Sequence, residues 1–198
     1  MTLESGVSRT VLHVGSGVYR PDKLHSLFSS SEWREVRVDI DPAVRPDIVT
    51  SITDMSMVAD ASVDAIWSSH NIEHLHAHEV SVALAEFRRV LKADGFALIT
   101  LPDLQAIARL VLEDKLDEPA YMSPAGPVAP LDMLFGLRTS IAHGNHYMAH
   151  HTGFTARTLG KALLGAGFGH VKVTRDEASF NLWAIAYITP PAGVDTAS

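Results

Sequence analysis

The most constraining feature of the sequence is a short apolar run that ends in closely spaced glycines. Residues 11–14 are followed by Gly15-Ser16-Gly17, a pattern typical of a buried strand that turns sharply. Residues 22–28 then have helical spacing, and residues 36–40 alternate between apolar and charged side chains as a second strand does. Strand, helix and strand in this order predict a βαβ unit with two parallel strands.

The rest of the chain continues the alternation of strands and helices. Further strands are expected at 48–52, 63–67, 96–101, 171–173 and 182–188, and helices at 76–91, 103–112 and 155–164. The last two strands are joined by the short stretch "RDEASFN" and predict an antiparallel hairpin. The expected fold is therefore α/β: a Rossmann-like, seven-stranded, mostly parallel sheet with an antiparallel last strand and helices on both faces.

One segment interrupts this pattern before the last helix. Residues 117–147 contain "DEPAYMSPAGPVAP", which holds several of the ten prolines, and they show weak periodicity. We expect an inserted lid there. The division expected is one domain over residues 1–190, with a frayed tail at 191–198.

Composition narrows the classes of partner. The chain has 198 residues and a formal net charge of −7, which disfavours nucleic acid as a partner because that affinity rests on clustered Lys and Arg. It has no cysteine, so only His, Asp and Glu are left as metal ligands. No apolar run approaches the length of a membrane span, and no leader pattern opens the sequence, so we expect a cytoplasmic protein without a membrane partner.

Polar residues at two further strand ends predict a nucleoside pocket. Ligands of such sheets bind at the carboxyl ends of the strands, where Asp39 follows Gly17 at the distance typical of a carboxylate that accepts from ribose hydroxyls. Asp54 ends the next strand and is expected to accept from the amine of adenine, with Ile40 and Met55 as apolar walls. Together these residues describe an adenosine pocket.

Two long stretches carry a resemblance to a known family. "VDAIWSSHNIEHLHAHEVSVALAEFRRVLKADGFALITLPD" and "HHTGFTARTLGKALLGAGFGHVKV" resemble class I S-adenosylmethionine (SAM)-dependent methyltransferases of the type 11-like, small-molecule and sugar group. The resemblance implies that fold and SAM as the cofactor. The cofactor-binding residues expected from it and from the strand ends are His13, Gly15, Ser16, Gly17, Asp39, Ile40, Asp54, Met55, Ser69 and His70.

The glycine loop departs from the family pattern at two positions. His13 stands where the family has an acid that helps to hold the methionine amino group, and Tyr19 stands where it has a third glycine. These departures leave open a non-catalytic SAM-binding or regulatory module. An NAD-binding domain is a weaker alternative, because Arg20 replaces the third glycine of G-x-G-x-x-G.

Eight of the eleven histidines fall in two windows. They are His70, His74, His76 and His78, then His143, His146, His150 and His151. A neutral imidazole is a suitable general base near neutral pH, so His70, His146 and His150 are the catalytic candidates. Alternatively, His74 packs at a helix start while His76 and His78 are solvated, and the second window binds a metal in a metal-dependent enzyme.

The predicted activity is methyl transfer by in-line displacement to an oxygen or nitrogen of a small metabolite or sugar. The segment "SSHN" follows the fourth strand, where the family's base-amino enzymes have Asn-Pro-Pro-Tyr or Asp-Pro-Pro-Tyr. This agrees with a small-molecule acceptor and no nucleic acid. No metal is assigned to the predicted site, and a homodimer is left open.

Overall fold

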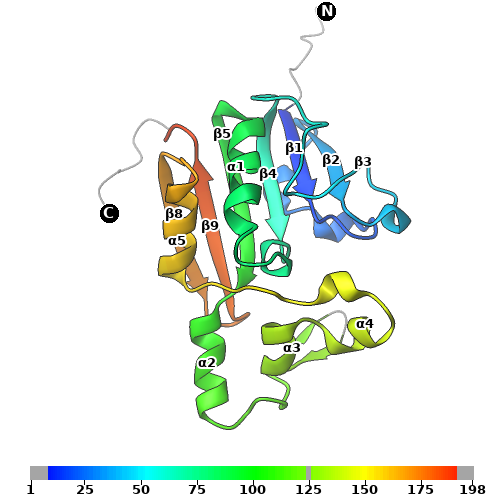
Figure 1. The fold of residues 1–198 in the computed structure, drawn as a ribbon, viewed down its shortest axis with the longest axis vertical. Coiled ribbons are helices and arrows are strands. Elements are labelled where there is room, and N and C mark those ends of the chain that lie inside the picture. Colours follow the sequence, from blue (N-terminus) through cyan, green and yellow to red (C-terminus); the bar gives the residue numbers. More distant parts are fainter. Residues whose placement is uncertain (1–8, 124–125, 191–198) are drawn as a thin grey trace, which may run out of the picture.

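A computed structural model describes residues 9–123 and 126–190, which contain a seven-stranded sheet in the order β3-β2-β1-β4-β5-β9-β8 (Figure 1). The strands are β1 (Arg9–Val14), β2 (Trp33–Asp39), β3 (Ile48–Val49), β4 (Val63–Ser69), β5 (Leu91–Pro102), β8 (His170–Asp176) and β9 (Asn181–Tyr187). The first five run parallel, and β9 is antiparallel to both β5 and β8. The predicted sheet and its closing hairpin are confirmed.

The order of the strands reverses between β1 and β4. From β1 the chain moves outward through β2 and β3, and it then returns to pair β4 with the other side of β1. In an open α/β sheet, a crevice forms at the carboxyl ends of strands beside such a reversal. The fold therefore places a ligand crevice after Val14 and Ser69.

The two faces of the sheet are covered unequally. In Figure 1, α1 (Val80–Val90) and α5 (Ala156–Gly165) lie together over one face, where Phe87 and Leu159 are fully buried in the main core. The 3₁₀ turns η1 (Pro21–Lys23) and η2 (Ser26–Phe28) belong to the other side, where Phe28 packs with Val11, Ala65 and Trp67.

The helix predicted over residues 22–28 is wrong, because two 3₁₀ turns take its place. Leu24 and His25 between them have extended backbone, with ψ of 126° and 141°. The His25 ring nitrogen accepts from the backbone N–H of Leu27 at 3.2 Å and caps the second turn. A side chain that caps a new turn competes with the continuation of the helix.

Two predicted boundaries also shift. The strand expected at 48–52 spans only Ile48–Val49, because Ser51 and Thr53 form a local turn through their hydroxyls at 2.7 Å. The helix expected from residue 76 starts at Val80, because the Glu79 carboxylate accepts from the backbone N–H of His76 at 2.8 Å and closes a preceding turn. By contrast, Asp103 caps α2 (Leu104–Leu112) as predicted and accepts from the Gln105 N–H at 3.0 Å.

Residues 117–147 contain short elements with a small core of their own. These are the hairpin strands β6 (Tyr121–Ser123) and β7 (Gly126–Val128), the helices α3 (Pro130–Phe135) and α4 (Arg138–Ala142), and the start of η5 (His146–Met148). Val128 and Met133 pack with Ile107 of α2, and Asp132 forms an ion pair with Arg138 at 2.8 Å. Helices of one or two turns leave little periodicity in a sequence, which accounts for the weak pattern. The segment lies beyond the carboxyl ends of the strands (Figure 1).

The frayed tail expected at 191–198 lies outside the described residues. Across residues 9–123 and 126–190, no helix combines the length and apolar character that crossing a membrane requires.

Candidate active site

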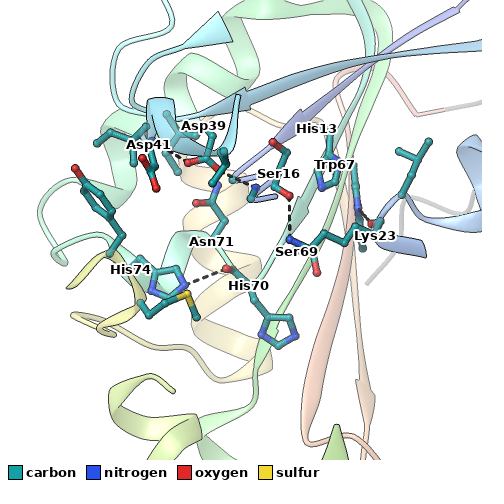
Figure 2. A pocket seen from close by; sticks show the side chains of 18 of the residues that line it. His13, Ser16, Lys23, Asp39, Asp41, Trp67, Ser69, His70, Asn71 and His74 are labelled. Atoms are coloured by element: carbon teal, nitrogen blue, oxygen red, sulfur yellow. Dashed lines mark hydrogen bonds between the residues drawn. The ribbon is translucent and has the colours of Figure 1, made fainter. Parts of the chain in front are cut away.

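A cavity of about 1010 Å³ opens at the carboxyl ends of β1, β2 and β4 (Figure 2). Most of the predicted cofactor residues line it: His13, Gly15, Ser16, Gly17, Asp39, Ile40, Ser69 and His70. The far part of the same cavity is lined by residues of the 145–151 stretch, among them His146, Tyr147 and His151. One continuous space therefore joins the glycine loop to the inserted segment.

The glycine loop follows β1 in a conformation that favours glycine. Gly15 and Gly17 have φ of 62° and 60°, in the left-handed region. A Cβ at Gly15 would lie 2.5 Å from Cγ of Asn71, and one at Gly17 would lie 2.6 Å from Nζ of Lys23. Neighbouring side chains therefore occupy the place of a side chain at both positions, so glycine lets Asn71 and Lys23 pack closely against the loop.

Asp39 ends β2 and fixes the loop from across the crevice. Its Oδ2 accepts from the backbone N–H of Gly17 at 2.7 Å, and its Oδ1 accepts from the N–H of Asp41 at 2.9 Å. The Arg37 guanidinium donates to the carbonyl oxygen of Gly17 at 2.5 Å and holds the loop from the other side. Each oxygen of Asp39 keeps a second acceptor position for a hydroxyl in the cavity.

The expectation that Asp54 and Met55 face the same pocket is not met. Asp54 is exposed and accepts from the Ser56 N–H at 3.1 Å, while Met55 is fully buried in the main core. Because β3 ends at Val49, the chain turns early, and Ser51 and Ile52 line the cavity instead.

His13 occupies the family's acidic position in a buried setting. Its Nδ1 lies 2.6 Å from Oε1 of Glu35. Burial lowers the pKa of His13 below 6.5, although the contact with Glu35 and its charge act in the opposite direction. The carboxylate of Glu35 is therefore in contact with this position, although His13 and not Glu35 lines the cavity.

Sequence reasoning missed two further residues of the cavity wall. Lys23 donates from Nζ to the carbonyl oxygen of Ser16 at 3.3 Å, and desolvation is the main cause that lowers its pKa. Asn71 packs against Gly15. Neither residue belongs to a recognisable motif, although the position of Asn71 directly after β4 was a usable signal.

His70 stands at the end of β4 in a strained position. Its φ is 48°, which is uncommon for a residue other than glycine, and its backbone N–H donates to the Thr100 carbonyl oxygen at 2.9 Å. The ring Nδ1 lies 3.2 Å from Oε1 of the buried Glu73. Desolvation lowers the pKa of His70, but the contact with Glu73 and its charge outweigh this effect and raise the pKa above 6.5.

Glu73 is 1% exposed, and the histidines around it favour the charged form of its carboxylate. Desolvation raises its pKa, but the contact with His70 and the nearby rings of His74 and His150 outweigh it and lower the pKa below 4.5. His74 lies at the cavity with both ring nitrogens 3.1 Å from carbonyl oxygens, those of His70 and Ala149 (Figure 2).

The second histidine window divides into separate places. His146 is exposed and lines the cavity, whereas His143 is exposed and bonds the Thr139 carbonyl oxygen. His150 lies outside the cavity wall, with Nδ1 2.9 Å from the carbonyl oxygen of Met133, so the expectation that it faces an acceptor is not met. His151 stacks on His76 at 4.3 Å between ring centroids.

Residues 12–99 match the family described as methyltransferase domain. The match runs from β1 into β5 and includes the glycine loop, Asp39 and the 3₁₀ turn η4 (Ile72–His74). This part of the chain therefore matches a methyltransferase domain, and the sheet around it has the class I methyltransferase fold. The two stretches quoted above and the strand order agree with this match.

Solved structures share the fold of this chain at low identity. A SAM-dependent methyltransferase from Archaeoglobus fulgidus is 15% identical, with 91% of this chain and 86% of that chain covered and a TM-score of 0.56. The 1,6-didemethyltoxoflavin-N1-methyltransferase of Burkholderia thailandensis, bound to 1,6-didemethyltoxoflavin and S-adenosylhomocysteine, is 18% identical, with 89% and 69% covered and a TM-score of 0.56.

The CMeT domain of the citrinin polyketide synthase is a third structural neighbour. It is 15% identical with a TM-score of 0.60, and the match covers 96% of this chain but 48% of that chain. The chain therefore spans about half the length of that structure. A comparison with curated protein sequences gives no match.

The residues around the glycine loop suit a polar cofactor such as SAM. Within the described parts of the chain, the buried atoms Ser16 Oγ and Asn71 Nδ2 have no hydrogen-bond partner. Buried polar atoms are ordinarily satisfied, so these two are available to a ligand in the cavity. These two atoms, together with the Asp39 carboxylate at the same cavity, fit a ligand that carries hydroxyl and amino groups.

Proposed function

We propose that the enzyme transfers the methyl group of SAM to an oxygen or nitrogen of a small metabolite or sugar. The observation that carries this proposal is the single cavity of about 1010 Å³ that runs from Gly15 to His146. Pockets for one small ligand usually span about 300–1,000 Å³. A space at the top of that range is large enough for a cofactor and a small acceptor side by side.

The glycine-loop end of the cavity is the proposed cofactor half. Asp39 would accept from the vicinal hydroxyls of the ribose, while Ser16 and Asn71 would contact the polar methionine part. Bound SAM supplies an electrophilic methyl group on a positively charged sulfur. The role of the loop is to fix the direction of that group, because alignment lowers the barrier of an in-line displacement.

The other half would receive the acceptor under the inserted segment. His70 lines the cavity with its Nδ1 3.2 Å from Oε1 of Glu73, and its Nε2 would take the proton of the acceptor. A general base of this kind contributes about 10²- to 10⁴-fold to a rate. His146 is the alternative base, carried by the exposed part of the insertion that would act as a lid.

Two further facts favour a small acceptor. The Burkholderia thailandensis structure, by its description, binds 1,6-didemethyltoxoflavin, a small molecule, in the same fold. The net charge of −7 disfavours a long phosphate backbone as the substrate.

Calorimetric titration of cofactor-free protein with SAM and with S-adenosylhomocysteine tests the cofactor half. We expect micromolar binding, and no binding to either compound would refute the proposed pocket. A panel of small hydroxyl and amine compounds then tests transfer, with S-adenosylhomocysteine release as the readout. SAM binding without release across the panel would favour the alternative of a non-catalytic SAM-binding module.

A further inference from the structure

Three side chains from two distant parts of the chain meet behind the wall of the cavity. Glu73 and His74 belong to η4 (Ile72–His74), shortly after β4. His150 follows η5, three residues after the inserted segment 117–147. One nitrogen or carboxylate oxygen of each lies within 4.8 Å of the others. We refer to these three residues as the Glu73 cluster.

The buried Glu73 carboxylate has the His70 ring as an ion-pair neighbour but makes no hydrogen bond with the described residues. In the part of the chain that the structure describes, neither of its oxygens accepts a hydrogen bond, and both are inaccessible. The His70 ring at 3.2 Å is within ion-pair distance but does not have hydrogen-bond geometry. A buried carboxylate without hydrogen bonds is costly, and a bound cation would reduce that cost.

The His150 ring is oriented as a metal ligand would be. Its Nδ1 faces the carbonyl oxygen of Met133 at 2.9 Å and so must carry the proton of a neutral ring. The lone pair is then left on Nε2. A ring that donates one N–H to a backbone carbonyl and offers the other nitrogen is the usual arrangement of a metal-binding histidine.

His74 has one contact more than a neutral ring can satisfy. Both of its nitrogens lie 3.1 Å from carbonyl oxygens, yet a neutral imidazole has a single N–H to donate. A bound cation would use the nitrogen that cannot donate. Ligand atoms around a single ion lie about 3–4 Å apart, whereas the atoms of the cluster are up to 4.8 Å apart. The His74 ring would therefore turn away from one carbonyl oxygen when an ion binds.

From this geometry we propose that Glu73, His74 and His150 bind one divalent transition-metal ion. Two imidazoles and one carboxylate are the donor set of zinc and of similar borderline ions, whereas magnesium and calcium prefer oxygen ligands alone. The ion would join η4 to the end of the inserted segment, next to the cavity that His74 lines. This site differs from the metal site suggested by the sequence, since His143, His146 and His151 lie outside the cluster.

The test is a Zn²⁺ titration of untagged, chelator-treated full-length protein in competition with a chromophoric chelator. We expect one tight site per chain. His150→Ala and Glu73→Gln should each weaken it by at least about 100-fold, because even the loss of a group that only supports a ligand costs about 10- to 100-fold. His143→Ala is the matched control, a histidine of the same segment outside the cluster, and should leave the affinity unchanged.

The X-ray absorption spectrum of the zinc-loaded protein provides a second readout. Two imidazole ligands are expected in the wild type and one in His150→Ala, which keeps the test decisive if Glu73→Gln fails to fold. Absence of a tight site, equal affinity in His150→Ala, or an equal loss in His143→Ala would overturn the proposal. Because no SAM is present in this titration, its result is independent of whether the chain transfers methyl groups.

Discussion

The backbone N–H of Gly17 donates to Oδ2 of Asp39 at 2.7 Å, which connects the loop after β1 with the end of β2. A carboxylate that holds the loop and also faces the cavity serves two purposes. It preserves the left-handed turn at Gly17, and it offers acceptor positions to a ligand's hydroxyls. This relationship makes Asp39 the most sensitive position of the proposed cofactor half.

Asp39→Asn is therefore expected to weaken SAM binding by about 10- to 100-fold. The substitution keeps one oxygen for the Gly17 N–H but removes the charge, and a hydrogen bond to a charged group contributes about 1.5–3 kcal/mol. Calorimetric titration measures the effect. Asp94→Asn, at an exposed position near the start of β5, is the control and should bind SAM as the wild type does. Equal affinities in Asp39→Asn and wild type would refute the assigned role.

Local patterns in the sequence predicted the glycine loop and the sheet. The two glycines after an apolar run and the Asp103 cap before a helix are residue types that mark a turn and a helix start within a few positions. The sheet followed from the apolar runs, since each strand carries its own hydrophobic signal. Asp54 was misplaced because its position depends on where β3 ends, and the local turn at Ser51 fixes that end.

Contacts between distant segments could not be predicted in the same way. The Glu73 cluster requires His150 to return from the inserted segment to η4, and nothing near Glu73 in the sequence indicates that approach. The sequence therefore showed that histidines gather in two windows but not which of them meet. That His150 lies outside the cavity wall could not be predicted either, because its place depends on a contact with the distant Met133.

The pH dependence of methyl transfer is a second prediction, and it follows from the pair His70 and Glu73. A general base acts in its neutral form, and the pKa of His70 is raised above 6.5. Turnover, measured as kcat/KM, should therefore rise with pH through a midpoint above 6.5. Glu73→Gln removes the charge that raises the pKa, so its midpoint should move to lower pH.

Proton NMR titration of the His70 ring checks the same shift without an acceptor. His70→Asn is the companion variant, because Asn tolerates the positive φ of this position while lacking the imidazole. It should lower kcat by about 100-fold or more with little change in affinity for SAM. A midpoint that stays in place in Glu73→Gln would contradict the pairing.

The third prediction concerns stability in acid. The pKa of Glu73 is lowered from 4.5 in the folded protein, so its charged form contributes stability that is fully present above pH 4.5 and is lost as the pH falls through the folded-state pKa. In chelator-treated protein, Glu73→Gln should thus unfold with a flatter pH dependence below 4.5. Urea unfolding at several pH values measures this slope.

The same variant should be less stable at neutral pH. Breaking a buried ion pair costs about 3–5 kcal/mol, and a smaller loss is expected here because the His70 side chain is 41% exposed. Identical slopes in the two proteins would show that Glu73 is not charged in the folded state.

Arg89 provides a fourth prediction, on the loop between β3 and β4. Its guanidinium donates to the carbonyl oxygens of Met55 and Val58 at 2.8 and 2.9 Å and pairs with Glu86 at 2.7 Å. Arg89→Ala should lower the free energy of unfolding by about 1–3 kcal/mol, since two carbonyl oxygens and the carboxylates of Glu86 and Asp60 lose their donor. The neighbouring Arg88 donates only to the carbonyl oxygen of Gly167, at 3.3 Å, among the described residues. Arg88→Ala should therefore change the free energy of unfolding by less than about 1 kcal/mol. Urea unfolding of both variants measures the two changes.

The last prediction compares two glycines of the inserted segment that share a backbone conformation but not their surroundings. Gly136 and Gly144 have φ of 94° and 92°, so alanine is strained at both. A Cβ at Gly136 would overlap the carbonyl oxygen of Met148, whereas one at Gly144 meets nothing within 4 Å. Gly144→Ala should therefore cost only backbone strain, about 1–3 kcal/mol.

Gly136→Ala should cost more, because α3 and η5 must also separate where they meet. That displacement would move Ala149 and His150, so affinity for Zn²⁺ should fall in Gly136→Ala and persist in Gly144→Ala. Thermal unfolding and the zinc titration of the two variants separate these effects. Equal stability and equal zinc affinity in both variants would show that the contact between Gly136 and Met148 does not position the end of the inserted segment.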